Sequence, residues 1–267
     1  PPQVVVALWG IESNYGQRLG DFEVVPALAT LTFNNFRAKF FRQQLIASLK
    51  ILSQGHIGLH AMKASWAGAM GQPQFMPTTY RDDAVDFEGD GRRDLWQSQA
   101  DVFASAANYL ARLGWRRDQP WGQEVTVPPD FDFALSGLDV RQPVREWQRL
   151  GVRDALGGRL PAATTEASLL LPAGAWGGPA FLVYDNFRII MNWNRSTLYA
   201  ISVGHLADRL AGGGPFLAVR PEREEALTRG EIVEMQEALT RLGYDTGGID
   251  GLVGSRTQEA IKGFQQS

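Results

Sequence analysis

Cysteine is absent from the 267-residue sequence. Without a thiol, this chain cannot contain a disulfide scaffold, a thiolate zinc site, a catalytic cysteine or a cysteine-linked lipid. Cysteine-free chains occur in oxidising compartments as well as in the cytosol, so this absence does not assign a location. The sequence also lacks any run of 18 apolar residues, which excludes a membrane-spanning segment within it.

The sequence also has no large excess of positive or negative charge. The 26 Lys and Arg residues against 29 Asp and Glu residues leave a formal net charge of -3, whereas nucleic-acid binding relies on an excess of bases. A nucleic-acid partner is therefore not expected. The residues from Glu222 onward contain nine acids and five bases, and those before them contain 20 acids and 21 bases. This asymmetry predicts two domains, the larger slightly basic and the smaller acidic.

Hydrophobic residues make up 44% of the chain, and their spacing predicts an α+β fold that is mainly helical. A helix is expected to begin at Pro2, since proline suits the first turn, and the Gly-, Met- and Pro-rich segment 58–80 is expected to form a shaped loop. Thr, Pro and Gly increase over 119–185, which indicates a β-rich insertion. Further helices are expected at about 36–52, 100–113 and 197–210, and strands at 124–127, 169–171 and 181–184.

Glycines at 212–214 followed by a proline interrupt the helical pattern. This break predicts a linker over 213–224, between a domain at 1–212 and a small helical domain at 225–267. A domain of two helices is too small for an enzyme and suits a binding module. The chain opens at Pro1 without Met or a charged leader, so we expect that further residues precede it.

A scarcity of carboxyl groups singles out Glu12. No Asp or Glu occurs between Glu23 and Asp82, while Glu12 follows the apolar and aromatic side chains of Leu8-Trp9-Gly10-Ile11. Such surroundings favour the neutral form of a carboxyl group and raise its pKa, which suits a general acid near neutral pH. The alternative is a solvated glutamate near a helix end, which is the commoner situation for a lone acid.

The second candidate region is Ser65–Tyr80, in which small residues alternate with aromatic, amide and thioether side chains and no residue is charged. Neutral donors next to apolar faces suit a neutral, polyhydroxylated ligand such as a sugar. A methionine-rich core is the alternative, and it accounts for Met70 and Met76. It explains Gln72 and Gln74 poorly.

Together these regions resemble the membrane-bound lytic transglycosylase B family. The resemblance covers most of residues 1–210, and its Ser65–Tyr80 string is highly specific. The matching strings are Trp9-Gly10-Ile11-Glu12 with Gly16, Ser65–Tyr80, Val85-Asp86-Phe87, Ala107-Asn108-Tyr109-Leu110, Asn192-Trp193-Asn194-Arg195-Ser196-Thr197 and Tyr199-Ala200. The resemblance implies a lysozyme-like helical catalytic domain with a small β-containing insertion, acting on the glycan strands of peptidoglycan.

Most glycosidases place two carboxyl groups across the bond that they cleave, whereas the first part of this sequence offers one. The resemblance implies that Glu12 protonates the oxygen of the MurNAc-β-1,4-GlcNAc bond and then, as a carboxylate, removes the proton of the MurNAc C6 hydroxyl. The product is a 1,6-anhydroMurNAc end, made without water and without a catalytic cofactor. A lysozyme-type muramidase and a catalytically silent peptidoglycan-binding scaffold are the alternatives.

Substrate-binding roles are implied by the same resemblance for two parts of the Ser65–Tyr80 string. Ser65 and Gln74 are expected to hydrogen-bond the acetamido and hydroxyl groups near the cleaved bond. The apolar wall of the site is expected to consist of Phe75, Met76 and Pro77.

Further substrate-binding residues are implied in later parts of the chain. Tyr109, Asn194 and Tyr199 are expected to line the groove and to hold Glu12 in place. Arg37 is a candidate to meet a lactyl or peptide carboxylate. The family usually has Tyr where this sequence has Trp193, so stacking is the role expected there.

The string Asp86-Phe87-Glu88-Gly89-Asp90-Gly91 matches the opening of an EF-hand calcium loop, with acids at positions 1, 3 and 5 and glycine at position 6. Position 12 holds glutamine in place of the closing glutamate. The resemblance supplies a later acid for this role and predicts a structural Ca²⁺ or Na⁺. The predicted ligands are Asp86, Glu88, Asp90, the backbone carbonyl of Arg92, and Asp101. A solvated acidic turn is the alternative.

The segment from about 225 to 267 resembles the type 1 peptidoglycan-binding domain. The matching residues are Gln236, Leu239 to Tyr244, Ile249 to Gly254, Thr257, Ala260, Ile261, Phe264 and Gln265. Its apolar positions suit a small core, so no ligand residue is assigned, and the module is expected to tether the enzyme to the wall.

The two resemblances together imply peptidoglycan strands as the main partner. Proteins of cell-wall synthesis or remodelling are further candidates. A periplasmic location is expected, and whether a lipid anchor precedes Pro1 is left open.

Overall fold

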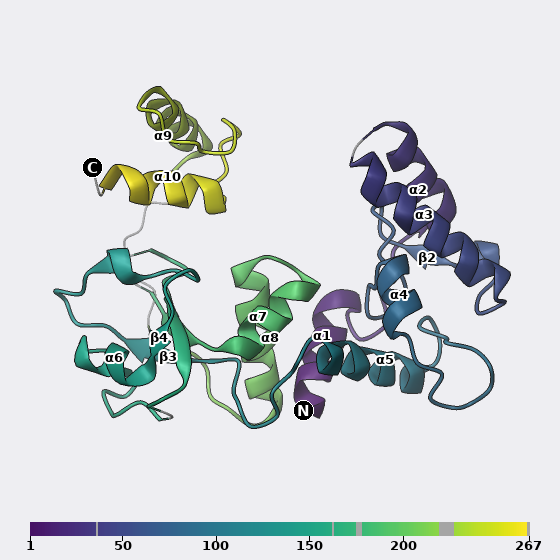
Figure 1. Cartoon of the computed structure of the whole chain (residues 1–267), viewed down its shortest axis with the longest axis horizontal. Coiled ribbons are helices and arrows are strands. Elements are labelled where there is room, and N and C mark those ends of the chain that lie inside the picture. The colour runs from purple at the N-terminus through teal and green to yellow at the C-terminus, as the bar shows by residue number, and fades with distance from the viewer. Residues whose placement is uncertain (36, 162, 175–177, 219–226, 266–267) are drawn as a thin grey trace. The chain divides into compact units, whose positions relative to one another are not determined.

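The computed structural model describes residues 1–35, 37–161, 163–174, 178–218 and 227–265 (Figure 1). The chain divides into two compact units. The first unit comprises residues 1–123 and 183–215, and the second comprises residues 124–182 and 216–267. Among the described residues, none of the helices combines the length and the apolar character that crossing a bilayer requires.

Helices build the first unit. α1 packs against α5 and α8, α2 against α3, α3 against α4, and α7 against α8 (Figure 1). These helices are α1 (Pro2–Ser13), α2 (Val24–Phe33), α3 (Ala38–Ser53), α4 (Pro77–Asp83), α5 (Gln99–Arg112), α7 (Asp185–Trp193) and α8 (Thr197–Leu210). The structure therefore confirms the mainly helical α+β fold, and the helices expected near 36–52, 100–113 and 197–210 are present.

The ends of α1 are set by local chemistry. Proline occupies its first turn, where a missing N–H group costs no helical hydrogen bond. The helix stops at Asn14, which has the left-handed conformation (φ 49°) and donates its N–H to the carbonyl of Gly10 at 2.9 Å. Glu12 consequently lies in the last turn of α1, one residue before its end.

The segment between α3 and α4 forms a shaped loop, as its composition predicts. It contains η1 (Leu59–Ala61) and β2 (Lys63–Ala64), and β2 pairs antiparallel with β1 (Phe22–Glu23). Met70 and Phe75 then exchange backbone hydrogen bonds of 2.8 and 3.0 Å, which closes a tight turn. The loop ends earlier than expected, because Pro77 occupies the first turn of α4.

The core of the first unit lies beneath this loop. Its buried residues come from α2, α3, the loop, α4, α5 and the segment between α4 and α5. They include Leu28, Phe41, Ile51, Met62, Met70, Phe75, Tyr80, Leu95 and Trp96. Half-buried aromatic residues pack against this core, among them Trp9 of α1, Tyr109 of α5 and Trp193 of α7.

A five-stranded sheet with the order β4-β6-β7-β3-β5 forms the centre of residues 122–183. Its strands are β3 (Gly122–Thr126), β4 (Gln142–Pro143), β5 (Arg153–Asp154), β6 (Glu166–Leu170) and β7 (Ala180–Val183). The pairs β3–β5 and β4–β6 are antiparallel. A short helix, α6 (Val144–Arg149), buries Trp147, whose Nε1 donates to the carbonyl of Ala167 at 3.1 Å. η2 (Phe133–Leu135) precedes β4.

The C-terminal residues form α9 (Arg229–Arg241) and α10 (Ser255–Gln265). α9 begins with a capping box, in which Thr228 and Glu231 each satisfy the other's backbone N–H group. The buried Gln236 fixes the loop between the two helices through hydrogen bonds to Asp250, Gly251 and Leu252. Residues 213–218 of the predicted linker have no helix or strand, and its residues 219–224 lie outside the described part of the chain.

Gly71 and Gly55 allow a test of how tightly the loop is packed. Both have positive φ (64° and 76°), but a Cβ at Gly71 would lie 2.6 Å from the Leu95 carbonyl oxygen, whereas a Cβ at Gly55 would meet nothing within 4 Å. Alanine at either position should lower the free energy of unfolding by about 1 kcal/mol because of the backbone conformation. Gly71→Ala should lose a further ~1–3 kcal/mol through overpacking, measured by urea denaturation. Equal losses in the two variants would contradict this close contact.

Candidate active site

Glu12 and Tyr199 form the centre of the candidate site. The Tyr199 hydroxyl donates a short hydrogen bond to Oε1 of Glu12. α8 positions the tyrosine, because the Ser196 side chain caps this helix and accepts the Tyr199 backbone N–H at 3.2 Å. The predicted proximity of Tyr199 and Glu12 is therefore present, although the two residues are 187 positions apart in the sequence.

Burial dominates the electrostatics of this pair. It raises the pKa of Glu12 from 4.5 to about 7, and the Tyr199 hydrogen bond opposes the rise because it stabilises the charged form. Burial, together with the nearby Glu12 carboxyl, also raises the pKa of Tyr199, so the phenol stays protonated. Within the described residues, no second carboxyl group contributes to the pKa of Glu12. The site thus offers one proton-transferring group whose pKa is raised toward neutral pH.

Gln72 connects the helix that carries Glu12 to the shaped loop. Its Oε1 accepts the indole N–H of Trp9 at 2.7 Å, and its Nε2 donates to the Trp96 carbonyl at 2.9 Å. A Cβ at Gly16 would lie 2.6 Å from Oε1 of Gln72, so only glycine leaves room for this amide. Gln72 was not among the predicted site residues, and its only signal in the sequence is an amide that a methionine-rich core explains poorly.

Ser65 and Gln74 are held by hydrogen bonds within the loop. The Ser65 hydroxyl accepts the backbone N–H of Ala69 at 3.1 Å. Gln74 has the left-handed conformation (φ 50°), and its Nε2 donates to the carbonyls of Gly71 (2.9 Å) and Leu19 (3.3 Å). Its Oε1 accepts no hydrogen bond from the described residues, which leaves an acceptor for a ligand.

Three aromatic rings from distant parts of the chain form a cluster. The ring centroids of Phe75, Tyr109 and Trp193 are 5.1–5.4 Å apart. The Trp193 indole N–H donates to the Pro73 carbonyl at 3.1 Å, which ties α7 to the loop. Burial raises the pKa of Tyr109. Phe75, predicted as part of a ligand-facing wall, is itself only 2% exposed and supports the cluster from within.

The other predicted binding residues have different surroundings. Met76 is half-buried at the N-cap of α4, and Pro77 is buried behind it. Asn194 ends α7, and its side chain accepts the N–H of Ser196 at 3.1 Å, so it shapes the corner before α8. Arg37 lies exposed at the N-cap of α3, with its guanidinium 4.5 Å from the centre of the Phe40 ring. No described contact joins Arg37 to Glu12.

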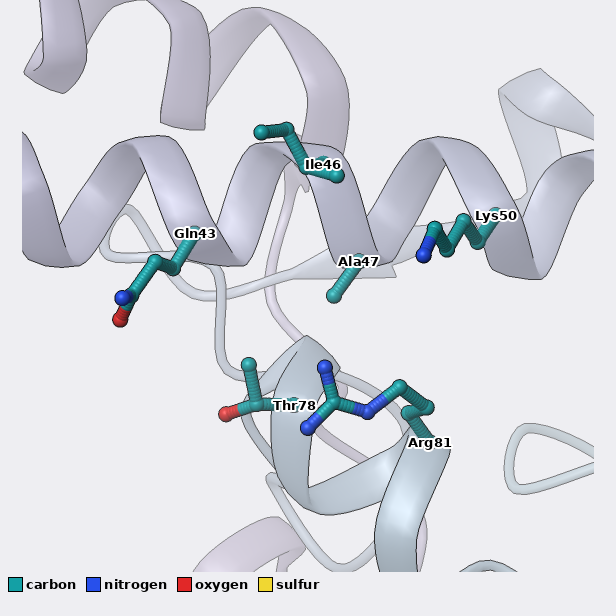
Figure 2. Close-up of a pocket in the computed structure, with 6 residues that line it drawn as sticks. All are labelled: Gln43, Ile46, Ala47, Lys50, Thr78 and Arg81. Carbon is teal, nitrogen blue, oxygen red and sulfur yellow. The ribbon is translucent and has the colours of Figure 1, made fainter.

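A separate hollow of about 270 Å³ lies between α3 and α4. Figure 2 shows the side chains of Gln43, Lys50, Thr78 and Arg81 around the space between the two helices. Arg81 pairs with the carboxylate of Asp82 at 2.6 Å, so part of its charge is neutralised. None of the predicted site residues lines this hollow, which separates it from the Glu12 site.

The predicted cation loop is closed by its own backbone. The Asp86 carboxylate accepts the N–H groups of residues 89–91 at 2.6–3.2 Å. The buried Asp101 accepts the N–H groups of Phe87 (2.8 Å) and Asp94 (2.7 Å). These bonds use the carboxylates to fold the loop.

The other predicted ligands are engaged in the same way. Glu88 accepts the Ser98 hydroxyl at 2.7 Å, and Asp90 accepts the Arg92 N–H at 2.8 Å. In the described parts of the chain, no three His, Asp or Glu side chains come together as a metal site. Hydrogen bonds thus hold the carboxylates of Asp86, Glu88, Asp90 and Asp101 within the loop, and the cation that they are predicted to bind stays a prediction.

Comparisons with known proteins show which family the chain belongs to. The family described as the transglycosylase SLT domain matches residues 1–208, and a peptidoglycan binding domain matches residues 228–267. The membrane-bound lytic murein transglycosylase B of Escherichia coli K12 is 34% identical over 224 residues, or 79% of this chain. The chain spans 57% of that relative's length.

Solved structures show the same similarity. SltB3 from Pseudomonas aeruginosa, crystallised with a NAG-anhNAM-pentapeptide, is 48% identical, with a TM-score of 0.91 over 99% of this chain and 71% of that one. The E. coli lytic transglycosylase SLT35, crystallised with calcium, is 32% identical, with a TM-score of 0.69 over 79% of this chain and 66% of that one. These neighbours confirm the lysozyme-like helical fold.

Glu12→Gln should stabilise the protein, and more strongly at high pH. Because folding raises the pKa of Glu12 from 4.5 to about 7, the native state loses stability as the pH rises through this range. The neutral amide escapes this loss, so its stability advantage should grow by up to about 3 kcal/mol between pH 4 and pH 8, followed by urea denaturation. An advantage that is independent of pH would mean that Glu12 has an ordinary pKa.

Proposed function

Because the chain belongs to the transglycosylase SLT domain family, we propose that it is a peptidoglycan lytic transglycosylase. It cleaves the MurNAc-β-1,4-GlcNAc bond without water and leaves 1,6-anhydroMurNAc ends. One observation carries this proposal: Glu12 is half-buried, has a pKa of about 7, and has no second carboxyl group among the causes of that shift. A single such group can serve first as acid and then as base.

Proton transfer by Glu12 accounts for both halves of the reaction. The protonated carboxyl gives its proton to the glycosidic oxygen as the bond between that oxygen and the MurNAc anomeric carbon breaks. The N-acetyl oxygen of the substrate stabilises the positive anomeric carbon. The Glu12 carboxylate then takes the proton of the C6 hydroxyl, whose oxygen bonds to the anomeric carbon and closes the anhydro ring. The carboxyl returns to its protonated form, and neither water nor a cofactor enters.

Tyr199 and Gln72 act on this step through Glu12. The Tyr199 hydroxyl donates to the carboxyl oxygen, so it stabilises the carboxylate that forms after the first proton transfer. Gln72 holds Trp9, one turn before Glu12 on α1, and thereby fixes the end of the helix against the loop. Both residues position the catalytic group without contacting the broken bond.

Substrate binding involves the loop and the aromatic cluster. We assign Ser65 and the free Oε1 of Gln74 to the acetamido and hydroxyl groups of the sugar, and Met76 to its apolar face. The cluster residues Phe75, Tyr109 and Trp193 support that surface, with Pro77 behind it. Asn194 shapes the groove at the α7–α8 corner. Arg37 is retained as a candidate for a substrate carboxylate outside the catalytic centre.

The C-terminal module has a different task in this proposal. We place the catalytic domain at 1–212, a linker at 213–224 and the peptidoglycan-binding module at 225–267. A module that binds the wall raises the concentration of wall polymer around the catalytic domain. This arrangement suits an enzyme of the bacterial periplasm, where peptidoglycan and its remodelling proteins are found.

Digestion of purified sacculi separates the three candidate functions. Mass spectrometry of the soluble products should show muropeptides with anhydro ends for the wild type, and these should fall by at least about a thousandfold for Glu12→Gln, because the only acid is lost. Products heavier by one water would identify a lysozyme-type muramidase. Binding to sacculi without any soluble product would identify a silent scaffold.

Tyr199→Phe should move the pH profile of this reaction. Activity requires protonated Glu12, so kcat/KM falls as the pH rises through its pKa, near 7. Removing the hydroxyl that stabilises the carboxylate should raise that pKa and shift the alkaline limb upward by roughly half to one pH unit. Tyr15→Phe is the matched control, since no described hydrogen bond joins the Tyr15 hydroxyl to Glu12. An unchanged limb, or one at lower pH, would exclude this role for Tyr199.

A further inference from the structure

A hollow lined by basic side chains lies within residues 124–182, outside the unit that contains Glu12. It has a volume of about 510 Å³ and is bounded mainly by arginines. Its lining residues, here called the arginine hollow, are Arg145, Gln148, Arg149, Arg153, Arg159 and Ala163. No resemblance or comparison assigns a role to these residues.

Local structure explains why the arginines face outward. Arg145 and Arg149 are four residues apart on α6 and therefore lie on one face of this helix. The opposite face is fixed in the core by the fully buried Trp147. Arg153 lies in β5 and Arg159 follows the turn after that strand, so both arms of the turn contribute a guanidinium.

Positive charge exceeds negative charge in the arginine hollow. Glu146 is shared by Arg149 at 2.6 Å and Arg145 at 3.5 Å. The guanidinium of Arg153 donates to the carbonyls of Gln148 and Val152 at 2.8 Å, which fixes its position without neutralising it. Arg159 has no ion pair or hydrogen bond with the described residues.

The nearest acid in the sequence does not compensate for this excess. Asp154 uses its Oδ1 to accept the backbone N–H groups of Leu156 (2.8 Å) and Gly158 (2.7 Å) within the turn. Within the described residues, no carboxylate lies within ion-pairing distance of Arg153 or Arg159. Two guanidinium groups thus remain for an external anion.

We propose that the arginine hollow binds the carboxylate groups of the acidic stem peptides that peptidoglycan strands carry, an inference that rests on the proposed function. Guanidinium groups pair with carboxylates through two parallel hydrogen bonds, which makes arginine suited to this task. A volume of about 510 Å³ exceeds the needs of a single inorganic ion and matches a short peptide segment. The enzyme would then hold strands that retain their peptides more tightly than peptide-free strands.

A lipid surface is the competing occupant. The turn beside Arg153 carries Leu156, whose side chain is 87% exposed, and basic residues next to an exposed leucine also suit an anionic membrane. The geometry favours the peptide, because the arginines line a hollow that a chain can enter, whereas a bilayer meets a protruding face. Anionic vesicles therefore form one arm of the test.

The test compares Arg159→Glu with Arg117→Glu. Both substitutions replace an arginine by a glutamate, so they change the net charge equally. Arg159 has no described ion pair or hydrogen bond, and Arg117 is an exposed arginine of the first unit. Binding of a synthetic stem tetrapeptide with free carboxylates should weaken roughly tenfold or more in Arg159→Glu, measured by calorimetry at low salt. Arg117→Glu should bind like the wild type, and amidation of the peptide carboxylates should abolish binding to all three proteins. Thermal unfolding checks that both variants fold, with Arg159→Gln as the milder substitution.

Equal peptide affinity in wild type and Arg159→Glu would overturn the proposal. The proposal would also be overturned if Arg159→Glu lost binding to phosphatidylglycerol vesicles but kept its affinity for the peptide. That result would assign the arginine hollow to a membrane. Anhydro products from peptide-free glycan strands are measured separately with the wild type. If these are absent while the peptide still binds through Arg159, the proposed function fails and the peptide site stands.

Discussion

A carboxyl group enclosed by protein has to be neutral or compensated, and the Glu12 site depends on this constraint. The last turn of α1 places Glu12 where burial raises its pKa to about 7, and one phenolic hydroxyl from α8 partly offsets that rise. If the charged form of the carboxyl group were fully compensated, the group would be ionised at neutral pH and could not donate a proton. A fully exposed carboxyl group would likewise lose its proton well below neutral pH. The packing of α1 against α8 therefore sets the acidity of the site.

The surroundings of Glu12 are built to keep this balance. The one described hydrogen-bond partner of the Glu12 carboxyl is the uncharged Tyr199, and the other site residues are uncharged as well: Gln72 bonds to an indole and a carbonyl, and Phe75, Tyr109 and Trp193 form an aromatic cluster. Ionised groups nearby would shift the pKa of Glu12 out of the useful range. The excess of guanidinium groups lies in the arginine hollow of residues 124–182, and none of these arginines contributes to the pKa of Glu12.

Much of the fold could be predicted from local pattern. The helices at 38–53, 99–112 and 197–210 follow apolar spacing and end near glycine or polar caps, so short-range chemistry sufficed. α2, α6 and α7 were not predicted, because each is at most ten residues long and depends on packing against its neighbours. The loop at 58–80 also contained the start of α4, since a proline can begin a helix as well as interrupt one.

The candidate site, like the fold, was predicted from the sequence only in part. By itself, the sequence determined that Glu12 stands alone among apolar residues in a stretch poor in acids, and the resemblance added Tyr199. Tertiary structure alone decided that Gln72 connects α1 to the loop, that Arg37 makes no described contact with Glu12, and that Asp86 and Asp101 accept backbone N–H groups of their own loop. The reason is physical: composition limits which charges are available, whereas hydrogen bonds and burial depend on which distant segments pack together.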